Sequence, residues 1–118
     1  METFKITRIF TDSEGESHFQ DINIPLNESG EIGLLSEAQN ADSVIFRKVK
    51  SSYNYDFHCA PAKQYIILLD GAIEIETSTG EKRSFFAGEV LLVEDTWGKG
   101  HRTRNLRPQV RSSIFITL

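Results

Sequence analysis

Short stretches in which apolar and polar residues alternate run through most of this chain. A period of two is typical of β-strands that bury one face. Strands are predicted for residues 4–10 and 18–26, which flank the polar turn TDSEGES, and for residues 43–50 and 72–77. Further strands are predicted for residues 64–70, 81–86, 90–94 and 110–118.

Two features of this pattern define the expected architecture. Residues 64–70 are apolar on both faces, as in a strand inside a sandwich or barrel, and the Asp70–Gly71 pair that follows suits a tight hairpin turn. Residues 27–42 have no such period and are expected to form a loop with at most a short helical turn. About eight short strands and no long helix predict an all-β sandwich or small barrel.

Composition narrows the class of protein. At 118 residues the chain suits one domain, here taken as 1–118, and nothing in it marks a linker or a repeat. A net charge of −4 and a pI near 5.3 argue against a nucleic-acid partner. The single cysteine, Cys59, cannot form an internal disulfide. No signal peptide and no apolar stretch of about 20 residues is present, so we expect a cytoplasmic protein without a membrane partner.

Candidate chemistry begins where His58 and Gln64 precede the apolar strand at 64–70. Neither residue type favours a strand. They are either ordinary polar residues of a loop or two members of a metal or ligand site at the mouth of a β-structure. If the strand period extends to Cys59, its thiol points away from the face of His58 and packs as a small apolar group.

Two segments resemble the paired motifs of the cupin superfamily. In residues 58–71 the first motif's series of histidine, histidine, glutamate and glycine reads His58, Ala60, Gln64 and Gly71, with the spacing kept. In residues 88–105 the second motif's glycine, histidine and asparagine are Gly88, His101 and Asn105. Together, in an all-β chain, the two motifs are more specific than either one alone.

The resemblance implies a cupin jelly-roll β-barrel of two antiparallel sheets with a pocket at its mouth. Cupins commonly hold one divalent metal there with histidines and a glutamate. Carried over residue by residue, the ligands are His58, Gln64 and His101, and Ala60 supplies none. Two imidazoles and a neutral amide suit Zn, Ni or Cu better than Fe or Mn, because the set carries no negative charge.

The loop before His101 supplies further candidates. Glu94 or Asp95 could be the missing carboxylate ligand or a general base. We expect substrate contacts from Trp97, Lys99 and Asn105, with Lys99 orienting a carboxylate. The alternative is a solvated hairpin tip with Trp97 packed on the barrel end.

Basic residues also cluster near this loop. Five of the thirteen lysines and arginines lie between positions 99 and 111, which suggests attraction of an anionic substrate such as a carboxylate or phosphate. If His101 faces the lumen, however, period two turns Arg102 and Arg104 to the opposite face.

These observations predict a small cupin-type protein that binds a divalent metal and a small polar organic substrate, with dioxygenase- or isomerase-like chemistry. The alternative is a barrel that binds or senses a small molecule without metal and without catalysis. The resemblance also implies a homodimer, formed by covering an exposed edge strand. The residues name neither the substrate nor the reaction.

Overall fold

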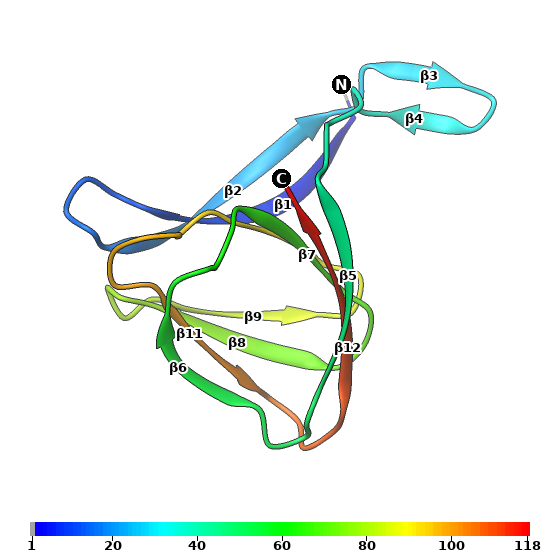
Figure 1. Cartoon of the computed structure of the whole chain (residues 1–118). Helices are drawn as coiled ribbons and strands as arrows, with labels where there is room; N and C mark the ends of the chain where they lie inside the picture. Colours follow the sequence, from blue (N-terminus) through cyan, green and yellow to red (C-terminus); the bar gives the residue numbers. More distant parts are fainter. Residues whose placement is uncertain (1) are drawn as a thin grey trace.

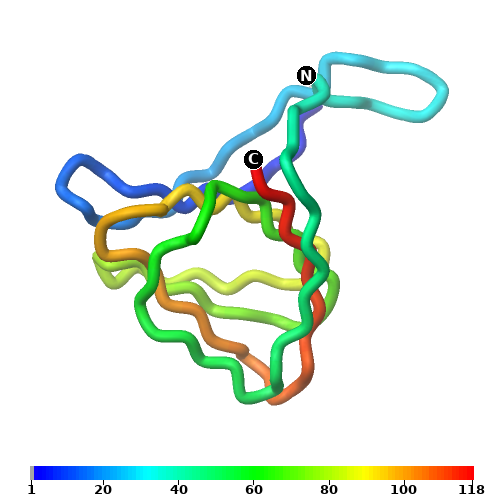
Figure 2. Tube along the Cα trace, viewed as in Figure 1, coloured from blue at the N-terminus to red at the C-terminus, as the bar shows by residue number. Residues whose placement is uncertain are grey.

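Every regular element of the protein is a β-strand. The structure, a computed structural model, describes residues 2–118 and is drawn in Figures 1 and 2. The strands are β1 (Thr3–Thr11), β2 (Ser17–Pro25), β3 (Glu28–Gly30), β4 (Gly33–Leu35), β5 (Ser43–Val49), β6 (Asn54–His58), β7 (Gln64–Leu68), β8 (Ala72–Thr77), β9 (Lys82–Phe86), β10 (Val90–Val93), β11 (His101–Asn105) and β12 (Arg111–Thr117). The all-β prediction is confirmed. Across residues 2–118 no helix has the length and apolarity needed to cross a membrane.

Two sheets form the body of the molecule (Figure 1). One has six strands in the order β2-β1-β10-β7-β12-β5, and the other has four in the order β6-β11-β8-β9. Neighbouring strands are antiparallel except β1 and β10, which pair in parallel. Strands distant in sequence become neighbours in this order, as in a jelly roll, and the sheet ends at β2 and β5.

The core lies between the two sheets. Ile9, Leu68 and Leu91 of the six-stranded sheet are fully buried, and Ile73 and Ile75 of β8 join them in one apolar cluster. Burying one such side chain contributes about 1.5–3 kcal/mol, so this cluster holds the sheets together and fixes the strand registers.

The segment 27–42 differs from the expected loop. It contains the two-stranded hairpin β3–β4, which projects from the body (Figure 2). Gly33 has a φ of 117° at the turn, a conformation that glycine adopts readily. All six strand residues are exposed, so backbone pairing alone defines the hairpin and no alternation of burial reveals it in the sequence.

Candidate functional site

A cavity of about 350 Å³ lies between the sheets. Its floor is apolar and includes Leu68, Ile73, Ile75, Leu91 and Val93. Its polar groups come from strands β5, β6, β7, β11 and β12 and the loop before β6, which places residues distant in sequence around one space. The lining includes His58, Gln64 and His101, so the structure brings the three predicted metal ligands together.

The pairing of β6 with β11 sets the two histidines side by side. His58 and His101 are register partners, and their ring centres are 4.7 Å apart. Gly100 allows this approach, because it has a φ of 71° and a Cβ at this position would collide with the His58 carbonyl oxygen. Glycine is therefore needed immediately before His101.

Asp95 fixes the imidazole of His101. The His101 Nδ1 atom lies 2.6 Å from Asp95 Oδ2, and both side chains are buried. A carboxylate accepts a hydrogen bond, so Nδ1 carries a proton, and in the neutral imidazole the free lone pair is on Nε2. The second oxygen, Asp95 Oδ1, is buried and has no hydrogen-bond partner within residues 2–118. Asp95 thus orients His101 and does not itself line the cavity.

A backbone carbonyl group orients the imidazole of His58 through Nδ1, as Asp95 orients that of His101. The His58 Nδ1 atom is 2.8 Å from the Asp56 carbonyl oxygen, which can only accept, so Nε2 is again the free nitrogen. Burial lowers the pKa of His58, which favours the neutral imidazole. The ring of Tyr55 packs against it at 4.0 Å between ring centres.

Gln64 and Cys59 complete this end of the cavity. Gln64 opens β7 and is 4% exposed, with its amide among the lining groups. Cys59 is also among the lining residues, but its thiol donates at 3.2 Å to the carbonyl oxygen of Gly98, which lies outside the lining.

Glu94 lies outside the cavity lining. Its carboxylate pairs with Arg8 Nε at 2.6 Å and with Lys63 Nζ at 2.8 Å. Burial alone would raise the pKa of Glu94, but its hydrogen bonds with Lys63 and Arg8 together lower it. A carboxylate held by two cations is a poor base, so the structure does not bring Glu94 into the site as ligand or base.

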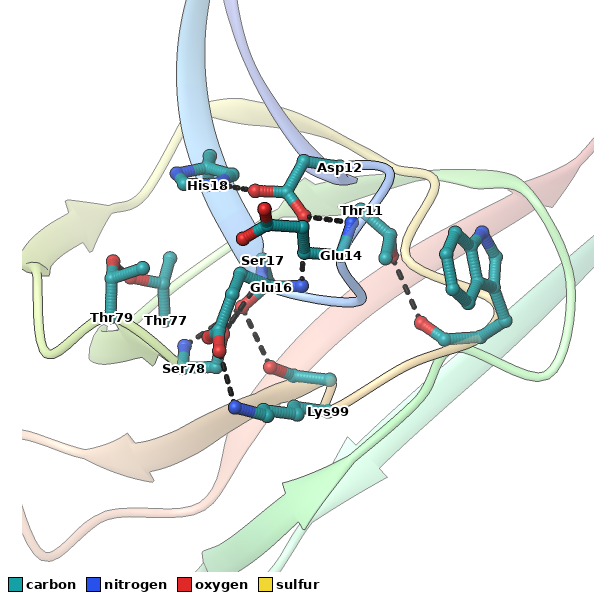
Figure 3. Close-up of polar contacts among 12 residues, drawn as sticks. Thr11, Asp12, Glu14, Glu16, Ser17, His18, Thr77, Ser78, Thr79 and Lys99 are labelled. Atoms are coloured by element: carbon teal, nitrogen blue, oxygen red, sulfur yellow. Dashed lines mark hydrogen bonds and ion pairs between the residues drawn. The ribbon is translucent and has the colours of Figure 1, made fainter.

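Trp97 and Lys99 meet the β1–β2 hairpin and not the cavity. Thr11 Oγ1 donates to the Trp97 carbonyl oxygen at 2.9 Å, and the Trp97 side chain is about half exposed. Figure 3 shows Lys99 directed at Glu16, which also accepts from Ser78 Oγ at 2.6 Å. Both residues therefore lie outside the cavity lining, on a partly exposed loop, which agrees with the alternative of a solvated hairpin tip.

Asn105 lies at the end of β11 remote from His101. Its side chain donates to the carbonyl oxygens of Lys50 and Ser51 and accepts from Arg111 Nε at 2.9 Å. It does not line the cavity, but it holds Arg111, which does. Asn105 is therefore a positioning residue in this structure.

The polar lining residues for which no role was predicted include Arg47, Tyr53, Tyr55, Thr103 and Arg111. A signal existed for Arg47, because the alternation in residues 43–49 puts it on the face of Val49. Arg111 belonged to the basic cluster, but its inward direction follows from pairing with β5 and β7. Across residues 2–118 no group of three histidine, cysteine or acidic side chains forms a ligand set.

Comparison with known proteins identifies relatives in structure only. No family model and no curated protein matches the chain. A protein of Neisseria meningitidis has a TM-score of 0.51 and 21% identity, covering 68% of this chain and 78% of its own. An RmlC-like cupin protein from Desulfovibrio desulfuricans has a TM-score of 0.46 and 12% identity, covering 96% of this chain and 81% of its own. The cupin domain of Cnp3 from Schizosaccharomyces pombe has a TM-score of 0.46 and 8% identity, covering 100% of this chain and 86% of its own.

At these identities the likeness concerns the fold alone. The strand order of the two packed sheets is that of a jelly roll, and the predicted all-β jelly-roll fold is confirmed. Activity must be argued from the side chains.

Proposed function

We propose that this protein binds a small polar organic molecule in the cavity, beside a divalent cation held by His58, His101 and Gln64. One observation carries the proposal. Both cavity imidazoles have Nδ1 engaged in a hydrogen bond, which leaves both Nε2 lone pairs available. An outer carboxylate or carbonyl that fixes the tautomer in this way is the usual arrangement around metal-binding histidines.

The donor set suggests which cation fits. Two neutral imidazoles and one amide oxygen match zinc, nickel or copper better than iron(II) or manganese(II). When bound, such an ion supplies Lewis-acid chemistry that polarises a substrate carbonyl, which favours an isomerase-like reaction over an oxygenase-like one. The protein's own residues hold the ion, keep the proton on Nδ1 of each ring, and surround the substrate with apolar side chains that exclude water.

A second candidate is a barrel that binds its ligand without metal. It is favoured by the absence of a carboxylate among the three candidate ligands and by the lack of a three-member acidic, histidine or cysteine cluster within residues 2–118. In this case the two Nε2 atoms accept hydrogen bonds directly from a ligand.

Metal analysis separates the two candidates. The untagged protein is purified without chelators, its metal content is measured, and the apo protein is titrated with zinc, nickel, copper, iron(II) and manganese(II). His58→Ala and His101→Ala are compared with His18→Ala, whose imidazole pairs with Asp12 outside the cavity. We expect near-stoichiometric metal in the wild type and His18→Ala and its loss in the two cavity variants. No binding of any of the five ions by the wild type would contradict the metal site and favour the second candidate.

A further inference from the structure

The end of the cavity opposite the histidines contains a buried positive charge. Arg111 on β12 is 2% exposed and lines the cavity. Within residues 2–118 no carboxylate lies within ion-pair distance of it, and the only hydrogen bond of its side chain runs from Nε to Asn105 Oδ1. A guanidinium has five N–H donors. Because only Nε donates, the terminal nitrogens of Arg111 have no protein acceptor within residues 2–118.

A second arginine accompanies it. Arg47 on β5 lines the same cavity and forms no ion pair within residues 2–118. Its register partner is Ser113, two positions from Arg111, so the two arginines lie diagonally on one face of neighbouring strands. Both guanidinium groups approach the ring of Tyr53, at 4.9 Å and 5.5 Å from its centre.

The charge balance around this pair is unusual for an acidic chain. The protein has 17 aspartates and glutamates against 13 lysines and arginines, yet no carboxylate lines the cavity. Burial lowers the pKa of Arg111, and the charge of Arg47 lowers it further. The nearby carboxylate of Asp70 accepts from the Ser112 backbone N–H at 2.6 Å and forms no ion pair with Arg111.

The hydrogen bond to Asn105 and the ring of Tyr53 compensate the charge of Arg111 only in part. A buried charge without an ionic partner is costly, and two like charges facing one space increase that cost. An oxyanion between the two guanidinium groups would accept from their terminal nitrogens, because arginine binds carboxylate and phosphate through parallel hydrogen bonds.

The cavity has two distinct ends. Arg111 is held by Asn105 at one end of β11, and His101 begins that strand four residues earlier, about 13 Å away along the backbone. The rings of Tyr53 and Tyr55, 6.3 Å apart, line the path from the arginines to His58. The floor between them is apolar.

We propose that the ligand of this cavity is a small organic anion, with its carboxylate or phosphate on Arg111 and Arg47 and the rest of the molecule extending over the apolar floor toward His58 and His101. The inference rests on the proposed function, whose substrate class it names. It differs from the sequence-based expectation, in which Lys99 orients the anion, because Lys99 is paired with Glu16 outside the cavity.

The test measures binding of benzoate, phenylphosphonate and neutral benzyl alcohol by NMR titration of the chelator-treated protein. Arg111→Met is compared with wild type and with Arg104→Met. Arg104 lies on β11, outside the cavity lining, and pairs with Glu74. We expect at least one of the two anions to bind wild type and Arg104→Met, benzyl alcohol to bind more weakly, and Arg111→Met to lose affinity for the anion by at least about tenfold. The better anion distinguishes carboxylate from phosphate.

Thermal unfolding of the same variants shows whether the arginine is structural. Without ligand, Arg111→Met should melt close to wild type, because removal of a buried charge without an ionic partner offsets the loss of the hydrogen bond to Asn105 and the contact with Tyr53. Retained anion affinity in Arg111→Met, equal binding of benzyl alcohol, or no anion binding by the wild type would overturn the inference. Loss of benzoate binding in His58→Ala with full retention in Arg111→Met would also overturn it. All of these outcomes are read without metal, so they are independent of the metal analysis.

Discussion

At the scale of single residues, the hydrogen bond between Asp95 and His101 has the clearest consequence. Asp95→Asn replaces the buried carboxylate by a neutral amide, which accepts more weakly and leaves an amide N–H₂ where Oδ1 already has no partner. We expect zinc affinity to fall by about 10–100-fold, the usual effect of losing such an outer partner. Zinc titration checks this, with circular dichroism showing that the fold persists. Unchanged zinc affinity in a folded variant would separate Asp95 from the site.

Glu94 is the residue whose charge state should make stability depend on pH. The hydrogen bonds with Lys63 and Arg8 outweigh burial and lower its pKa in the folded protein. Its stabilising contribution is therefore complete above the unfolded pKa, near 4.5, and is lost as the pH falls through the lower folded pKa. We expect Glu94→Gln to cost about 1–2 kcal/mol at neutral pH and much less in acid.

Urea unfolding of wild type and Glu94→Gln at a series of pH values measures this difference. Glu37→Gln changes an exposed carboxylate without an ion pair in the described part of the chain and serves as the control. A gap between wild type and Glu94→Gln that does not narrow in acid would be inconsistent with the two-cation contact.

At the scale of elements, burial determined what the sequence could predict. Strands such as β7 and β8 bury apolar side chains, and their patterns predicted them closely. β6 and β11 are rich in polar residues and were not predicted as strands; the motifs covered only His58 of β6 and the whole of β11. The two strands that carry the cavity histidines therefore had no hydrophobic signal.

The close pairing of β6 and β11 predicts the effect of replacing Gly100. Gly100→Ala and Gly80→Ala both place a side chain at positive φ, with similar backbone strain. Only Gly100 faces another strand, because a Cβ there meets the His58 carbonyl oxygen whereas nothing lies within 4 Å at Gly80. We expect Gly100→Ala to lower the free energy of unfolding by at least about 2 kcal/mol more than Gly80→Ala. Equal losses in urea unfolding would show that the strands can separate freely.

At the scale of the whole molecule, we expect a homodimer contact at the edge of the six-stranded sheet. β5 ends this sheet, and Val44, Ile45 and Phe46 are exposed on it, Phe46 by 80%. An uncovered apolar edge strand tends to pair with another chain, which supports the proposed homodimer. Phe46→Lys should convert a dimer to a monomer in sedimentation experiments, with Phe86→Lys on β9 as control. A monomeric wild type would exclude the dimer.

Assembly of the site also belongs to this scale. The histidines and Gln64 could be identified from motif spacing, because the spacing within each of the two motifs is short and regular. Arg47 and Arg111 meet only through the pairing of β5 with β12, across more than half of the chain, and no local pattern records that pairing. The roles expected for Glu94, Trp97 and Lys99 relied on a loop whose side chains the structure directs to other partners.

The most direct test of the proposed metal site is a nitrogen–proton correlation spectrum of the histidine rings at mildly alkaline pH, recorded before and after adding zinc. We predict that His58 and His101 carry the proton on Nδ1 and that zinc shifts both Nε2 signals. His18, whose Nε2 contacts Asp12, should keep its proton on Nε2 and remain unchanged. A proton on Nε2 of either cavity histidine, or a spectrum insensitive to zinc, would contradict the proposed metal site.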